Sequence, residues 1–131
     1  MSMDALRPTD DETLFAEVIE MATFVLVHGA FGSPAELAPV IPLLEAQGHR
    51  AIAVDLPCTD PAATLDDYAR TVVDAMAGIE GPVVVVGHSA GGATISLVPG
   101  LTRVDRLVYV TAVVPEPGRS IVALAGGLAR S

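Results

Sequence analysis

A serine flanked by glycines carries the clearest chemistry in this sequence. Gly87, Ser89 and Gly91 form a G-x-S-x-G pattern, with the β-branched run 83–86 before it and a helical pattern over 90–98 after it. At such a strand-to-helix turn the backbone of the serine is strained and its hydroxyl is exposed. The turn brings the positions two before and two after the serine together, so only glycines avoid a collision there. The pattern therefore predicts a nucleophilic serine.

A second segment could stabilise the charge that attack by a serine creates. N–H groups at the helix start after Ser89 can bind a developing oxyanion. Residues 24–31, FVLVHGAF, form a predicted strand that ends in His28 and Gly29. A loop in this upstream position suits a second oxyanion donor.

Strand and helix patterns alternate along the part of the chain that must position these residues. Strands are predicted over 24–27, 50–55, 83–86 and 106–112, and helices over 64–79, 90–98 and, after a proline-interrupted start at Ser33, Pro34 and Glu36, over 43–47. This alternation is typical of β-α-β units. We expect the second strand to be covered on both faces. The predicted fold class is α/β, a three-layer α/β/α sandwich with a mainly parallel sheet.

Composition limits the possible functions. The chain has 131 residues, 51% of them apolar, and a net charge of −9 from 7 basic and 16 acidic residues. So few basic groups argue against nucleic acid and anionic membrane surfaces as partners. No apolar run reaches the roughly 18 to 20 residues that span a bilayer, and the acidic start is unlike a signal peptide. A single cysteine, Cys58, fits a reducing compartment, so we expect a cytoplasmic protein.

Five segments, in order, resemble the first half of an α/β-hydrolase: FVLVHGAF, PLLEAQGH, AVDLP, VVVVGHSAGG and LVYVTAVVPEPG. They are most similar to the small esterase, methylesterase and hydroxynitrile-lyase-like group of that superfamily. The resemblance implies a partial α/β-hydrolase fold over 21–131 without cofactor or metal. The acidic residues 1–20 would be an N-terminal extension, either helical or disordered. By the same resemblance Ser89 is the nucleophile, and the N–H groups of Ala30 and Ala90 form the oxyanion hole.

Supporting roles follow for the residues around these three. Phe31 and His88 would flank the substrate pocket, and His28 and Gly29 would shape the oxyanion loop. We expect His28 to brace the scaffold, because its position before Gly29 points it inward. His88 is a poor base for Ser89, because neighbours on a sharp turn point apart. We expect the third histidine, His49, at the surface.

A catalytic base is missing downstream of the serine. The fold uses the order Ser, then Asp or Glu, then His, yet no histidine follows Ser89 and the carboxylates that follow are Asp105 and Glu116. Some relatives place the acid where Glu116 lies. General-base assistance contributes about 10² to 10⁴-fold in rate, so we do not expect full turnover from this chain alone.

Three explanations stay open: a truncated hydrolase of small carboxylic esters, which we favour, a split enzyme completed by another chain, or a noncatalytic module that binds a small ligand. A lyase activity also stays open. The strand over 106–112 would form an unpaired apolar edge, on which a second copy or a complementing chain could pair.

Overall fold

A parallel sheet of four strands organises the part of the chain that the computed structural model describes, residues 22–115. The strands lie in the order β2-β1-β3-β4 and every neighbouring pair is parallel. Their bounds are β1 Thr23–Val27, β2 Arg50–Val54, β3 Val83–His88 and β4 Arg106–Val110. Parallel neighbours need crossover connections, which the helical segments between the strands supply. The predicted α/β class is therefore confirmed.

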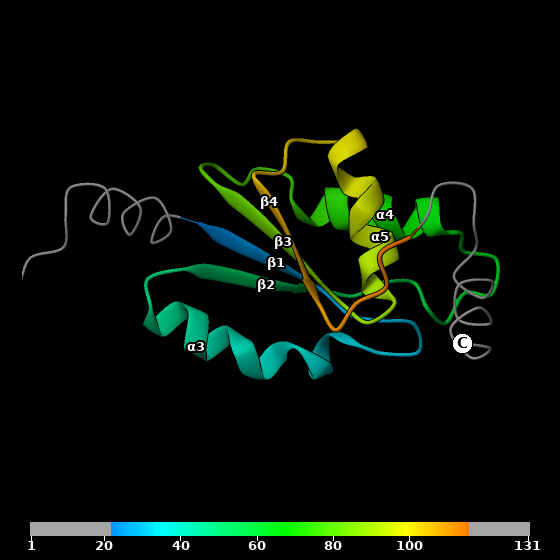
Figure 1. Ribbon diagram of the computed structural model, residues 1–131, viewed down its shortest axis with the longest axis horizontal. Helices are drawn as coiled ribbons and strands as arrows, with labels where there is room; N and C mark the ends of the chain where they lie inside the picture. Colours follow the sequence, from blue (N-terminus) through cyan, green and yellow to red (C-terminus); the bar gives the residue numbers. More distant parts are fainter. Residues whose placement is uncertain (1–21, 116–131) are drawn as a thin grey trace, which may run out of the picture.

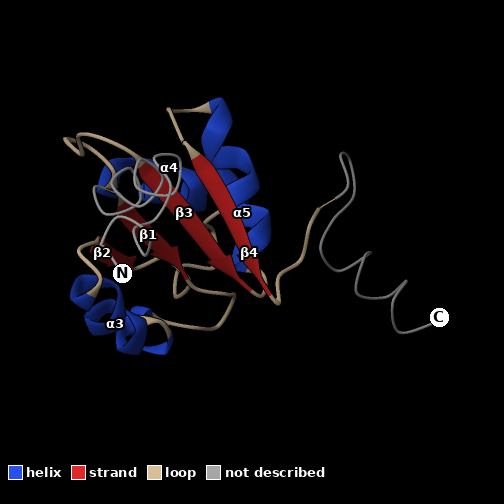
Figure 2. Ribbon diagram, turned by 60° about the vertical axis from the view of Figure 1, so that its left-hand side comes forward, coloured by secondary structure: helices blue, strands red, loops and turns tan. Residues whose placement is uncertain are grey.

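Helices cover both faces of this sheet, which makes three layers (Figure 1). Helix α3 (Ile41–Ala46) lies on one face, and α4 (Leu65–Ala75) and α5 (Gly91–Leu97) lie on the other, as Figure 2 also shows. Short 3-10 turns are η1 (Pro34–Glu36), η2 (Ala38–Val40) and η3 (Val98–Gly100). Prolines in the segment before α3 remove N–H donors, which is why a regular helix starts only at Ile41.

Helix α4 begins with a capping box. The Thr64 hydroxyl accepts a bond from the Asp67 N–H at 3.2 Å, and the Asp67 carboxylate accepts one from the Thr64 N–H at 2.8 Å. The predicted end at residue 79 is wrong, because the helix stops at Ala75. Gly78 turns the chain there with a φ of 80°, a left-handed conformation that glycine adopts readily.

The two faces of the sheet carry separate apolar clusters. Val25, Val27 and Val85 pack with α4 and α5, while Val84 and Val86 pack on the side of α3. Successive side chains of a strand point to opposite faces. The next two residues of β3 continue this alternation, so that position 87 faces α5 and position 88 faces the α3 layer.

Two expectations about burial are wrong. Strand β2 forms one edge of the described sheet, and most of its residues are half-buried rather than covered on both faces. His49 is not a surface residue: it is only 7% exposed, and its ring meets Phe24 edge-on at 4.8 Å. A short helix and turn before β2 bring this histidine back to the start of β1, where Thr23 pairs with Arg50.

Strand β4 forms the other edge among residues 22–115, where Val108 is 37% exposed and Val110 is 43% exposed.

The predicted extension 1–20 and the carboxylate of Glu116 lie outside the described residues. No helix within residues 22–115 is long and apolar enough to cross a membrane.

Candidate active site

Ser89 sits at a strained turn between β3 and α5. Its φ is 55°, a left-handed value that costs a non-glycine residue on the order of 1 to 3 kcal/mol. Backbone bonds hold it there: its N–H donates to the Val110 carbonyl at 3.3 Å, and its carbonyl accepts from the N–H groups of Gly92 and Val113 at 3.1 and 3.0 Å. The side chain is exposed at the carboxyl end of the sheet, the end where open α/β folds bind ligands.

The glycines of the pattern allow segments to approach closely. A Cβ on Gly87 would lie 2.8 Å from the Gly91 carbonyl oxygen and from a terminal carbon of Ile95. A Cβ on Gly91 would lie 2.7 Å from the Val27 carbonyl oxygen and 2.8 Å from that of His28. The expected collision across the turn is thus present at Gly87, whereas Gly91 is required by β1. The glycine at 91 lets the helix start rest on the end of that strand.

The predicted oxyanion loop lies against the same turn. A Cβ on Gly29 would be 3.3 Å from the Ser89 Cβ and 3.4 Å from the Ala90 nitrogen. Neither the Ala30 N–H nor the Ala90 N–H donates a hydrogen bond to any group within residues 22–115. The structure therefore brings together Ser89 and the two backbone segments predicted to bind an oxyanion.

The Gly29 carbonyl controls where the Ala30 N–H points. This oxygen accepts from His28 Nδ1 at 2.8 Å and from the Gly32 N–H at 3.1 Å. In a trans peptide the N–H is opposed to the C=O of the same plane, and the described chain has no cis bond. Two donors on the Gly29 oxygen therefore hold the Ala30 N–H in the opposite direction.

His28 is fully buried and both of its ring nitrogens are engaged. Nδ1 donates to the Gly29 carbonyl, and Nε2 accepts from the Leu56 N–H at 3.1 Å. One neutral tautomer, with the proton on Nδ1, satisfies both bonds. No ring nitrogen is left to take a proton from Ser89, which fits the expected bracing role.

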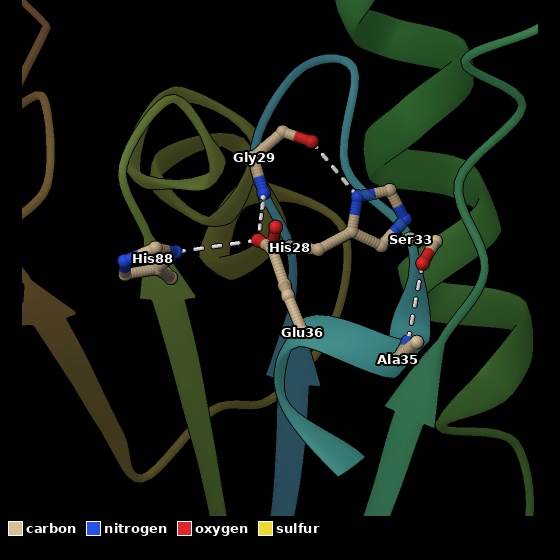
Figure 3. Close-up of polar contacts among 6 residues, drawn as sticks. All are labelled: His28, Gly29, Ser33, Ala35, Glu36 and His88. Atoms are coloured by element: carbon tan, nitrogen blue, oxygen red, sulfur yellow. Dashed lines mark hydrogen bonds and ion pairs between the residues drawn. The ribbon is translucent and has the colours of Figure 1, made fainter.

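His88 points away from the turn toward a residue of η1 (Figure 3). Its Nδ1 lies 3.2 Å from Oε1 of Glu36, and the same oxygen accepts from the Gly29 N–H at 3.0 Å. The Gly29 N–H chiefly, and His88 secondarily, lower the pKa of Glu36, so this carboxylate is charged at neutral pH. Sequence reasoning treated Glu36 only as part of a helix start and missed this contact, which joins positions 52 residues apart.

The remaining predicted residues are not gathered at Ser89. Phe31 has a φ of 61° and is fully exposed, so the described residues do not enclose it in a pocket. Asp105 cannot be the acid of a triad, because it bonds to Val83 at the start of β3. Six residues of strand, about 20 Å, separate Val83 from Ser89.

Within 22–115 no three His, Cys, Asp or Glu side chains are placed to hold a metal ion.

Comparison with known proteins agrees with this architecture. Residues 24–131 match the Alpha/beta hydrolase family. The pyrethroid hydrolase of Sphingobium wenxiniae is 39% identical over 103 aligned positions, and the match covers 72% of this chain and 37% of that protein. The polyneuridine aldehyde esterase of Rauvolfia serpentina is 33% identical over 109 aligned positions, and the match covers 75% of this chain and 41% of that protein.

A solved structure of a pyrethroid hydrolase from Sphingobium faniae JZ-2 superposes with a TM-score of 0.65 at 37% identity. The match covers 76% of this chain and 43% of that one. The chain thus spans about two fifths of the length of these relatives. With a family match that extends from β1 past the end of β4, the chain belongs to the alpha/beta hydrolase family.

Proposed function

We propose that this chain supplies the nucleophile and the oxyanion hole of a serine hydrolase that acts on small carboxylic esters. One observation carries the proposal: Ser89, strained at φ 55°, lies beside a loop whose Ala30 N–H has no partner within residues 22–115. The names of the two relatives support a hydrolase, and that of the polyneuridine aldehyde esterase supports an ester as the substrate.

The reaction divides into two steps. The Ser89 oxygen bonds to the ester carbon while its proton passes to a general base, and the N–H groups of Ala30 and Ala90 bind the oxyanion. The tetrahedral intermediate then collapses, the bond to the alcohol oxygen breaks and the alcohol leaves with the proton. Water releases the acid from the acyl-enzyme by the same route. Since no histidine follows Ser89, the proposal assigns the base to a residue outside these 131.

Chemical rescue tests this proposal on the chain as it stands. The purified protein is treated with a fluorophosphonate with and without added imidazole, and its intact mass is followed over time. Ser89 attacks phosphorus, fluoride leaves and imidazole takes the serine proton. An oxyanion hole alone retains about 10³ to 10⁴-fold of rate over water, so we expect a slow adduct that imidazole accelerates.

The matched controls are Ser89→Ala, which must lose the adduct, and Ser2→Ala, which removes a serine far from Ser89 in the sequence and must keep it. A protein that is folded by circular dichroism but gains no Ser89-dependent mass, even with imidazole, would contradict the hydrolase proposal. That result would favour the noncatalytic binding module.

A further inference from the structure

We propose that Glu36 is a positioning residue of the oxyanion loop: one oxygen of its carboxylate holds the loop at Gly29 against the strand that carries the nucleophile. This inference rests on the proposed function, because the loop it positions is the one assigned to the oxyanion.

The carboxylate joins two segments that are distant in sequence (Figure 3). Oε1 accepts from the Gly29 N–H at 3.0 Å, directly after β1, and contacts His88 Nδ1 at 3.2 Å, at the end of β3. His88 continues the alternation of Val84 and Val86 along β3, so its side chain lies on the α3 side of the sheet. The turn η1 lies on the same side. The alternation of the strand thus accounts for the position of His88 in this contact.

The loop is shaped to receive this side chain. A Cβ on Gly32 would lie 2.6 Å from Oε2 of Glu36 and 2.9 Å from its carboxyl carbon. The absent side chain at Gly32 therefore leaves the space that the carboxylate fills. Ser33 caps η1 with its hydroxyl, which accepts from the Ala35 N–H at 3.3 Å, so the turn that carries Glu36 is itself anchored.

These bonds fix both peptide planes around Gly29. The plane before it is held through its N–H by Glu36, and the plane after it is held through its carbonyl by His28 and Gly32. A glycine can otherwise adopt many combinations of φ and ψ. With both planes held, the direction of the Ala30 N–H is set before a substrate arrives, and a donor aligned in advance stabilises an oxyanion most effectively.

Ionisation strengthens the arrangement. The pKa of Glu36 is lowered chiefly by the Gly29 N–H, and a hydrogen bond to a charged acceptor is roughly twice as strong as a neutral one. A glutamine would keep an oxygen that accepts from Gly29 but would carry no charge. Alanine would remove the acceptor altogether. The two replacements therefore separate the hydrogen bond from the charge.

The contact itself is tested by NMR without any reaction. In the wild-type chain the chemical shift of the Gly29 amide proton should change with pH as Glu36 is protonated. The midpoint of that change should lie at a pH below the usual pKa range of a glutamate. Glu36→Gln should abolish that titration. Glu45→Gln, which removes an exposed glutamate of α3, should leave it unchanged. A Gly29 signal that does not titrate in the wild type would overturn the inference.

The positioning role is tested by the rate of imidazole-assisted labelling at Ser89. Removing an oxyanion donor costs about 10² to 10³-fold, and a misaligned donor loses part of this, so Glu36→Ala should label about 10 to 100-fold more slowly. Glu36→Gln should restore most of the rate. Equal rates for Glu36→Ala and wild type would overturn the role. If the wild type does not label, the proposed function fails, and the Gly29 titration alone then decides whether Glu36 holds the loop.

Discussion

Replacing Gly91 with alanine should destabilise the protein although the position is helical. The new Cβ would lie 2.7 Å from the carbonyl oxygen of Val27, the last residue of β1, and 2.8 Å from that of His28, which follows the strand. Ordinary C···O contacts are about 3.3 to 3.6 Å, so α5 must move away by roughly 0.6 Å. Strand β1 cannot yield easily, because it is paired on both sides, with β2 and β3.

The magnitude follows from two opposing effects. Forcing an extra carbon into a packed site costs about 1 to 3 kcal/mol, and two backbone contacts place Gly91→Ala at the upper end. In the opposite direction, alanine raises the free energy of unfolding by up to about 1 kcal/mol, because it restricts the unfolded chain more than glycine does. We therefore expect a net loss of about 2 kcal/mol in the free energy of unfolding.

Urea unfolding followed by circular dichroism measures this loss. With a denaturant slope of about 1 to 3 kcal/mol per molar, the midpoint should fall by about 1 M. Gly100→Ala is the matched control, because a Cβ there meets nothing within 4 Å, and it should unfold at or slightly above the wild-type midpoint. Equal midpoints for the two variants would refute the reasoning that β1 excludes a side chain at Gly91.

Three further variants test other parts of the structure. Thr64→Ala removes the capping box of α4 and should cost about 1 kcal/mol in urea unfolding; an unchanged midpoint would contradict this. The pKa of Asp105 is lowered, first by the Val83 N–H and then by Arg103, so its stabilisation is present above pH about 4 and is lost as the pH falls through its folded pKa. Asp105→Asn should therefore lower the urea midpoint at pH 7 and lower it less at pH 2. An equal decrease at the two pH values would contradict a stabilising role for the charge of Asp105. Val108 lies exposed on the edge strand β4, where we propose that a second copy pairs; Val108→Lys should weaken self-association in sedimentation velocity, and a monodisperse wild-type monomer would end that proposal.

Features that depend on adjacent residues could be predicted from the sequence. The β-branched run before Ser89 predicts a buried strand, and β3 starts at the predicted residue, Val83. The glycine pattern predicts the sharp turn, which appears as a positive φ at Ser89. The end of α4 was missed, because the apolar periodicity continues past Ala75 while Gly78 adopts a left-handed conformation. Gly81 also follows this segment with a positive φ, and periodicity alone does not show that the helix stops before Gly78 rather than before Gly81.

The contact of Glu36 with His88 shows why the rest of the site needed the structure. Alternation along β3 is enough to place His88 on the face of α3, so half of the contact follows from a local rule. The other half depends on η1 and η2, where prolines at 34 and 39 replace the 3.6-residue period with 3-10 turns. Without a regular period, the sequence does not show which side chain of that segment contacts the sheet. Residues that orient a catalytic loop from such segments are therefore found by packing, whereas the nucleophile itself is found by its pattern.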